Sequence, residues 1–130
     1  MSRNPMVPNP ATIKKITSET GSGDVKTFMV VFDDPRLAEG FTYRSGQCAM
    51  LSVFGVGECM ISITSTPTRP GFLEFSVKKV GRVTDALHEA REGDKIGLRG
   101  PYGNCFPLEK MKGKNLVFVG GGSGWPHCVR

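Results

Sequence analysis

The residues best suited to chemistry lie where a strand gives way to a helix, in the stretch from Phe75 to Ala90 (FSVKKVGRVTDALHEA). Alternating apolar and polar side chains predict a strand that stops at Gly81, and Thr84 is the expected N-cap of a short helix that stops near Gly93. A helix start offers unpaired backbone N–H groups and a positive dipole end, and the preceding glycine lets a ligand approach. This combination binds phosphate, although an ordinary strand-to-helix connection uses the same residues.

A second glycine-rich stretch lies near the end of the sequence. Asn115 to Val119 (NLVFV) reads as a short apolar strand, and Gly120 to Gly124 (GGGSG) follows it directly. A buried strand that runs into a glycine loop is how a nucleotide-binding α/β domain starts. A glycine loop alone is weak evidence for such a domain.

The elements that must position these residues are mostly short strands. Apolar and β-branched runs separated by Gly, Pro and Asp predict strands over residues 11–19, 25–32, 48–54, 60–65, 72–80 and 95–99. Residues 36–44 are expected to be irregular and residues 100–103 to form a tight turn. The pattern predicts an all-β fold, a six-stranded antiparallel Greek-key barrel with one capping α-helix.

Composition sets the remaining expectations. The chain has 130 residues, 38% of them hydrophobic, and a formal charge of +5, which favours one domain with an anionic partner. No apolar run approaches the roughly 18 residues of a membrane helix, and prolines interrupt the N-terminus, so we expect a cytoplasmic protein. The cysteines at 48, 59, 105 and 128 lack metal-site or disulfide spacing and are expected to be mostly buried thiols, while His88 and His127 are expected at the surface.

Taken in order, these segments resemble the flavin domain of the ferredoxin-NADP reductase superfamily. The likeness is strongest to a group of electron-transfer subunits: the dihydroorotate dehydrogenase B flavin subunit, the sulfhydrogenase gamma subunit and the corresponding subunit of anaerobic sulfite reductase. It runs from about residue 4 to residue 126 and rests on NPMVPNPATI, YRSGQCAMLSV, GECMISITSTP, VKKVGRVTDALHEAREGD, GPYGNCFPL and VFVGGGSG. The resemblance implies a flavin-binding barrel over residues 11–108, after an extended lead-in over residues 1–10. Residues 109–130 would be a connector with the first strand and glycine loop of an incomplete NAD(P)-binding domain.

The family's residues carry over by position. Its flavin motif, R-x-Y-S or a variant with Ile or Leu for Tyr, falls on Cys59–Met60–Ile61–Ser62. The resemblance implies that Ser62 bonds the flavin near N5 and that Ile61 packs on its ring. Cys59 replaces the arginine that pairs with the flavin phosphates, so Lys78, Lys79 or Arg82 and the amides of residues 82–84 would have to meet that charge. The expected cofactor-binding residues are Cys59, Ile61, Ser62, Ile63, Val77, Lys78, Lys79, Gly81, Val83 and Thr84.

The expected function is that of a flavin domain in an NAD(P)H-linked electron-transfer oxidoreductase. FAD is expected before FMN, and NAD(P)H only if a second domain is supplied, with electrons passing to an iron-sulfur or other redox subunit. No catalytic side chain, metal or iron-sulfur cluster is expected in these residues.

One alternative is a non-catalytic interaction module that kept the barrel and lost the flavin. Another, single-stranded nucleic-acid binding, is disfavoured because the aromatic residues are not grouped with Lys and Arg on one strand. Residues 116–119 would pack on the barrel, fray or pair with a partner chain, including a second copy.

Overall fold

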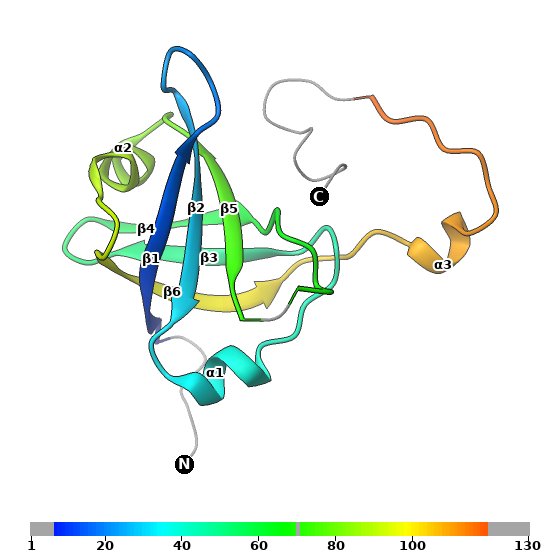
Figure 1. The fold of residues 1–130 in the computed structure, drawn as a ribbon, viewed down its shortest axis with the longest axis horizontal. Coiled ribbons are helices and arrows are strands. Elements are labelled where there is room, and N and C mark those ends of the chain that lie inside the picture. The colour runs from blue at the N-terminus through cyan, green and yellow to red at the C-terminus, as the bar shows by residue number, and fades with distance from the viewer. Residues whose placement is uncertain (1–6, 70, 120–130) are drawn as a thin grey trace.

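The computed structural model describes residues 7–69 and 71–119 (Figure 1). One sheet contains β1 (Asn9–Ser18), β2 (Val25–Phe32), β3 (Cys48–Val53), β4 (Gly57–Ser62), β5 (Leu73–Lys78) and β6 (Lys95–Tyr102). Its order is β4-β3-β6-β1-β2-β5, and every pairing is antiparallel. The prediction of a six-stranded antiparallel sheet is therefore confirmed. The prediction of a single helix is wrong, because the described residues form α1 (Pro35–Gly40), α2 (Arg82–Glu89) and α3 (Leu108–Met111).

The sheet folds so that β1, β2 and β5 run across β3, β4 and β6 at a steep angle (Figure 1). Its core lies between these two groups and includes Phe28, Leu51, Phe75 and Leu98, each at most 1% exposed. Burying such side chains is the main stabilising contribution to the fold. The edge strands β4 and β5 approach each other at an isolated bridge between Ile63 and Phe75.

Helix α2 begins earlier than the sequence suggested. Its N-cap is Gly81, and Thr84 is the third helical residue rather than the cap. The Thr84 hydroxyl accepts the backbone N–H of Val80 at 2.9 Å and of Gly81 at 2.8 Å, and it donates to the Gly81 carbonyl at 3.0 Å. The helix ends at Glu89, and the predicted stop, Gly93, instead sits in the turn before β6 with φ +96°.

Buried contacts hold α2 against the sheet. Leu87 is 1% exposed, and His88 is buried too, so the surface position predicted for His88 is wrong. His88 Nε2 lies 2.7 Å from the Val77 carbonyl on β5, and Lys26 Nζ on β2 donates to the His88 carbonyl at 3.1 Å. His127 lies outside the described residues.

Of the six predicted strands only the one over residues 25–32 keeps both boundaries, and residues 9 and 10 of the predicted lead-in belong to β1. The largest differences are three. Residues expected to be irregular form α1, because the Asp34 carboxylate accepts the Arg36 N–H at 2.9 Å and Pro35 suits a first helical turn. Strand β4 starts at residue 57 rather than 60. Strand β6 continues through the predicted turn at 100–103, where Tyr102 pairs with Cys48 beyond an irregularity in the register.

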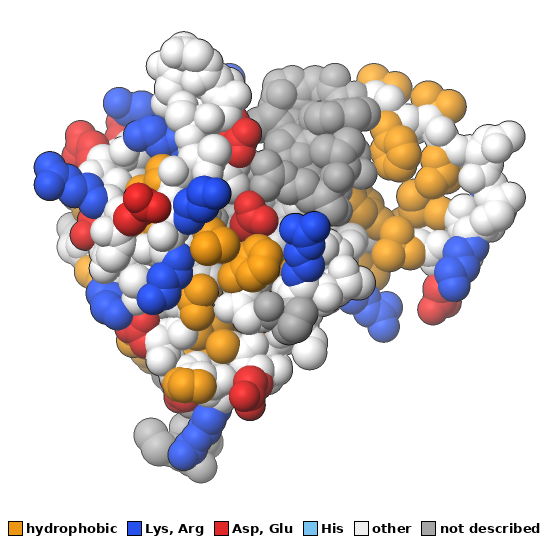
Figure 2. Space-filling model, viewed as in Figure 1, with side chains coloured by type: hydrophobic (Ala, Val, Ile, Leu, Met, Phe, Trp, Pro, Cys, Tyr) orange, Lys and Arg blue, Asp and Glu red, His pale blue; other side chains and the backbone are white. Residues whose placement is uncertain are grey.

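The chain leaves the sheet after β6 (Figure 1). The strand predicted over residues 115–119 does not form, and Val117 and Val119 are 89% and 92% exposed. Hydrophobic side chains gather along this segment, at the right of Figure 2. The predicted glycine loop, Gly120 to Gly124, lies outside the described residues.

The cysteines do not match the predicted burial. Cys48, Cys59 and Cys105 are free thiols of intermediate exposure rather than buried, and Cys128 lies outside the described residues. Across residues 7–69 and 71–119, no helix has the length and apolar character needed to span a membrane.

Candidate functional site

The start of β4 meets the start of α2, and these two elements carry most of the predicted site. A side-chain carbon placed on Gly57 would lie 3.3 Å from Cγ2 of Val83, so a glycine at 57 lets the two elements approach closely. Cys59 and Ile61 lie opposite the buried residues Leu51 and Ala49 of β3, and both pack against the core while staying half-buried. The start of β4 thus lies against Val83, and Cys59 and Ile61 follow along the same edge strand.

The approach to the α2 N-terminus is open at Gly81. Its φ of −175° is an extended conformation that any residue can adopt, and no atom lies within 4 Å of the position a side-chain carbon would take. Neither backbone conformation nor packing within the described residues thus requires a glycine there. The amides of Arg82 and Val83 follow this open position and have no acceptor within the helix, because they belong to its first turn. A phosphate group fits this environment.

The hydroxyl of Thr84 is already engaged. Its three bonds to Val80 and Gly81 tie the turn to the helix, and the side chain is 7% exposed. Thr84 thus shapes the turn, while Arg82 at the helix start is exposed.

The other predicted residues differ in how far they are exposed. Ile63 and Val77 are 3% and 0% exposed, so their side chains belong to the core and only their backbone could meet a ligand. Lys78, the last residue of β5, and Lys79 are exposed and lie three and two residues before Gly81. The Lys79 amide donates to the Asp24 carbonyl at 2.8 Å. Ser62 ends β4, half-buried. The sequence-predicted residues thus flank one region of β4, β5 and α2 but do not all present side chains to it.

The electrostatics of the site follow from the residue at position 59. Burial, and secondarily the charge of Glu58, raises the pKa of the Cys59 thiol, which therefore stays neutral near pH 7. No positive charge comes from this position. Lys78, Lys79 and Arg82 are the cationic side chains of the 78–84 turn.

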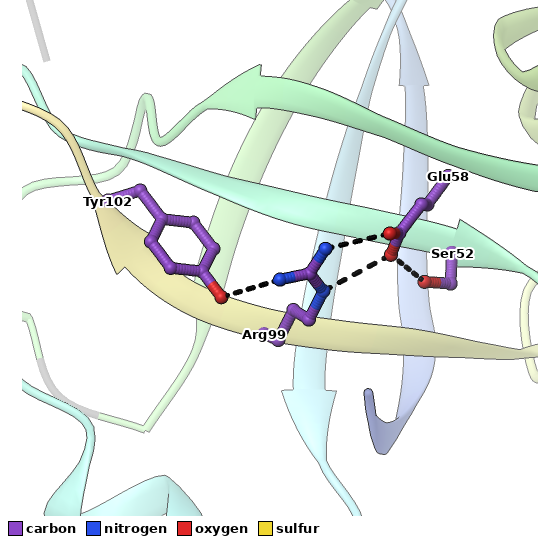
Figure 3. Close-up of polar contacts among 4 residues, drawn as sticks. All are labelled: Ser52, Glu58, Arg99 and Tyr102. Carbon is purple, nitrogen blue, oxygen red and sulfur yellow. Dashed lines mark hydrogen bonds and ion pairs between the residues drawn. The ribbon is translucent and has the colours of Figure 1, made fainter. Parts of the chain in front are cut away.

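Sequence reasoning missed the residues that join β4 to its surroundings. Gly57 and Glu58 lie between the strands predicted over residues 48–54 and 60–65, and the sequence does not single out Glu58 although it adjoins Cys59. Arg99 and Tyr102 were assigned to a strand end and a turn, yet they form one polar cluster with Glu58 (Figure 3). Period-2 alternation along the strand places Glu58 on the face opposite Cys59. This alternation is the sequence signal that could have indicated a polar contact of Glu58 on the outer face.

A larger hollow lies elsewhere in the fold. It has a volume of about 560 Å³ and is lined by the end of β2, the start of β5 and the residues after α1, including Phe41, Tyr43 and Phe72. The predicted cofactor residues do not line it. The hollow and the candidate site are therefore separate parts of the described surface.

Comparison with known proteins gives a consistent set of relatives. Residues 12–106 match the family described as oxidoreductase FAD-binding domain. The chain is 41% identical over 121 residues to sulfhydrogenase 1 subunit gamma of Pyrococcus furiosus, covering 93% of this chain and 41% of that subunit. It is also 41% identical over 109 residues to a probable dihydroorotate dehydrogenase B (NAD(+)) electron transfer subunit of Methanocaldococcus jannaschii, covering 84% of this chain and 36% of that protein. The chain thus spans about two fifths of the length of these relatives.

Solved structures share the fold. A ferredoxin NADP+ reductase from Neisseria gonorrhoeae with bound FAD and NADP superposes with a TM-score of 0.64 at 20% identity, over 77% of this chain and 40% of that one. An NADH-dependent reduced ferredoxin-NADP oxidoreductase superposes with a TM-score of 0.60 at 25% identity, over 82% of this chain and 36% of that one.

Proposed function

The chain belongs to the oxidoreductase FAD-binding domain family, and from this premise we propose that it is the flavin domain of an NAD(P)H-linked electron-transfer oxidoreductase. The observation that carries the proposal is the junction of β4 and α2. Gly57 packs on Val83 there, while Gly81 leaves the helix start open. Such a junction suits a ligand with a flat apolar ring at one end and phosphate groups at the other.

Within this proposal each element has its own task. Ile61 supplies an apolar surface for the flavin ring, and Ser62 a hydroxyl for hydrogen bonding near it. The amides of Arg82 and Val83 donate to phosphate oxygens, and the cationic side chains of the 78–84 turn offset their charge. FAD supplies the capacity to accept hydride and release single electrons, so these residues need only bind and orient it.

The preference for FAD rests on the family and leaves FMN as the alternative. Because Cys59 is neutral, phosphate recognition depends on backbone donors and on exposed side chains, which hold a phosphate less tightly than a bidentate arginine. We also propose that the sheet closes into a Greek-key barrel at the bridge between Ile63 and Phe75, with the flavin along the remaining gap between β4 and α2.

The proposed partners follow from the relatives. Their names describe a sulfhydrogenase subunit and an electron transfer subunit, and on that analogy an iron-sulfur or other redox subunit would receive the electrons. NADH or NADPH would bind to a second domain. An interaction module without flavin remains the alternative function, and Cys59 in place of the arginine is the observation that favours it.

Titration of the protein with FAD, FMN and riboflavin, followed by flavin absorbance and fluorescence, tests the proposal. We expect saturable FAD binding at micromolar concentration. We expect Gly81→Val to abolish it by filling the approach to the α2 amides, while lowering stability by about 1 kcal/mol or less through the altered cap. Gly21→Val, at another glycine with nothing within 4 Å, is the matched control and should bind FAD like wild type. If neither FAD nor FMN binds the wild type, the interaction-module function takes precedence.

A further inference from the structure

A polar cluster spans three strands on the outer face of the sheet (Figure 3). Arg99 on β6 reaches across β3 and contacts the carboxylate of Glu58 on β4 through two nitrogens, with Nη2–Oε1 at 2.7 Å and Nε–Oε2 at 3.2 Å. Ser52 Oγ on β3 donates to Glu58 Oε2 at 3.0 Å, and Arg99 Nη1 donates to Tyr102 Oη at 2.9 Å. A bidentate pair held by two further hydroxyls is fixed in direction as well as in distance.

The strand register creates room for this arrangement. Ser52 lies opposite Glu58 on one side and opposite Gly97 on the other. A side-chain carbon at Gly97 would come within 3.0 Å of Ser52 Cβ and 2.6 Å of Pro8 Cβ, so the absence of a side chain there is a packing requirement. The Arg99 side chain, two residues further along β6, is 12% exposed and covers this part of β3.

The cluster contacts β4, a strand at the edge of the sheet. Strand β4 is hydrogen-bonded along its length to β3 alone among the described strands. Glu58 lies between Gly57, which packs on Val83 of α2, and Cys59, whose side chain points to the opposite face. The Arg99–Glu58 contact therefore holds β4 at the point where it meets the start of α2.

We propose that Arg99 and Glu58 are positioning residues that set the separation between the β4 edge and the α2 N-terminus, so that one FAD molecule can reach both. This inference rests on the proposed FAD binding. FAD uses the ring-binding part on β4 and the phosphate-binding part on α2 together, whereas riboflavin, which lacks phosphate, uses the β4 part alone. Losing the Arg99–Glu58 ion pair, which we call the clamp, should therefore weaken FAD binding more than riboflavin binding.

The test compares dissociation constants for FAD and riboflavin in Arg99→Leu, Glu58→Gln and the charge exchange Glu58→Arg/Arg99→Glu. The exchange is feasible because the hydroxyls of Ser52 and Tyr102 can each donate or accept a hydrogen bond. We expect each single substitution to weaken FAD binding about tenfold and riboflavin binding by about twofold or less, since a shift of the order of 1 Å in one wall of a site has effects of this size or greater. The exchange should restore most of the FAD affinity.

Lys95→Met provides the control. Lys95 forms an ion pair with Asp33, with Nζ 3.0 Å from Oδ2, and neither residue lies on β4. It should leave the ratio of the FAD and riboflavin dissociation constants unchanged. Equal losses for both ligands, FAD affinity unchanged in Glu58→Gln, or no recovery in the exchange would each overturn the clamp while leaving FAD binding intact. If Arg99→Leu does not fold, Arg99→Lys and Glu58→Gln decide in the same way. Absence of FAD binding by the wild type would overturn the clamp together with the proposed function.

Discussion

Thr84 shows how one hydroxyl can shape the turn that leads into a helix. Its hydroxyl accepts hydrogen bonds from the N–H groups of Val80 and Gly81 and donates one to the Gly81 carbonyl, and residue 84 is only 7% exposed. A substitution that removes the oxygen takes this acceptor from the N–H groups of Val80 and Gly81, while the Gly81 carbonyl keeps the bond from the Asp85 N–H at 2.7 Å. Each lost hydrogen bond of this kind costs about 0.5–1.5 kcal/mol net.

Thr84→Val tests this role because valine keeps the shape of threonine and removes the hydroxyl. We expect the free energy of unfolding to fall by about 1–3 kcal/mol, the net contribution of the two hydrogen bonds from Val80 and Gly81 that are lost. Thr84→Ser keeps the oxygen and should lose clearly less. Urea denaturation of the flavin-free protein measures both values. A valine variant as stable as wild type would mean that solvent replaces all three bonds.

At the scale of elements, α2 depends on contacts far from its N-terminus. His88 in its last turn approaches the Val77 carbonyl, its ring lies 6.1 Å from the ring of Phe28, and Lys26 donates to the carbonyl at the helix end. A cation near the C-terminal carbonyls also interacts favourably with the helix dipole. These contacts fix the direction of the helix, and therefore the position of the amides at its other end.

His88→Phe is the substitution that separates the ring from its polar contact. It preserves an aromatic ring against Phe28 and removes the nitrogen that faces the Val77 carbonyl, which should cost about 1–3 kcal/mol of unfolding free energy. His88→Gln retains an N–H donor and should recover part of the loss. Thermal or urea unfolding provides the measurement, and a phenylalanine variant at least as stable as wild type would contradict the role assigned to this contact.

Local sequence patterns predicted where the strands lie better than they predicted the first and last residue of each strand. Alternation along Phe75–Val80 and the run Val25–Phe32 were enough to place β5 and β2, because each strand carries its own period. The start of β4 at Gly57 and the continuation of β6 to Tyr102 depend on pairing with β3, which is distant in the chain from β6, and no local pattern records such a register. His88 was misplaced for the same reason, since its partner lies on β5.

The sequence points to residues 59–63 and 77–84 as the candidate site, and their role in cofactor binding stays a prediction. The contacts that join the elements carrying these residues could not be predicted from the sequence. The approach of Gly57 to Val83 and the reach of Arg99 to Glu58 join residues far apart in the chain, so they could emerge only from the folded sheet. The segment over residues 115–119 failed as a strand because an apolar run needs a neighbouring strand to pair with.

At the scale of the whole molecule, the described residues form one sheet and a segment that leaves it. Residues 112–119 contribute no helix or strand, and four apolar side chains in a row, Leu116 to Val119, are exposed. Apolar surface of this kind is ordinarily covered by further structure. Nothing in residues 7–69 and 71–119 forms a second sheet beside the flavin edge.

A polypeptide of residues 1–130 should therefore fail to oxidise NADH or NADPH at a useful rate even when FAD is bound. Hydride transfer requires the nicotinamide to be held about 3–3.5 Å from the flavin, and such positioning contributes several kcal/mol to lowering the barrier. The described residues supply the edge of β4 and α2 where we propose that the flavin binds, and they form no second domain that could hold a nicotinamide there. The measurement is NADH and NADPH oxidation by the FAD-loaded polypeptide with an artificial electron acceptor, with free FAD at equal concentration as the control. Saturable turnover of about 1 per second or faster, within the range of ordinary enzymes, would show that a nicotinamide site exists within these residues or forms between copies of the chain.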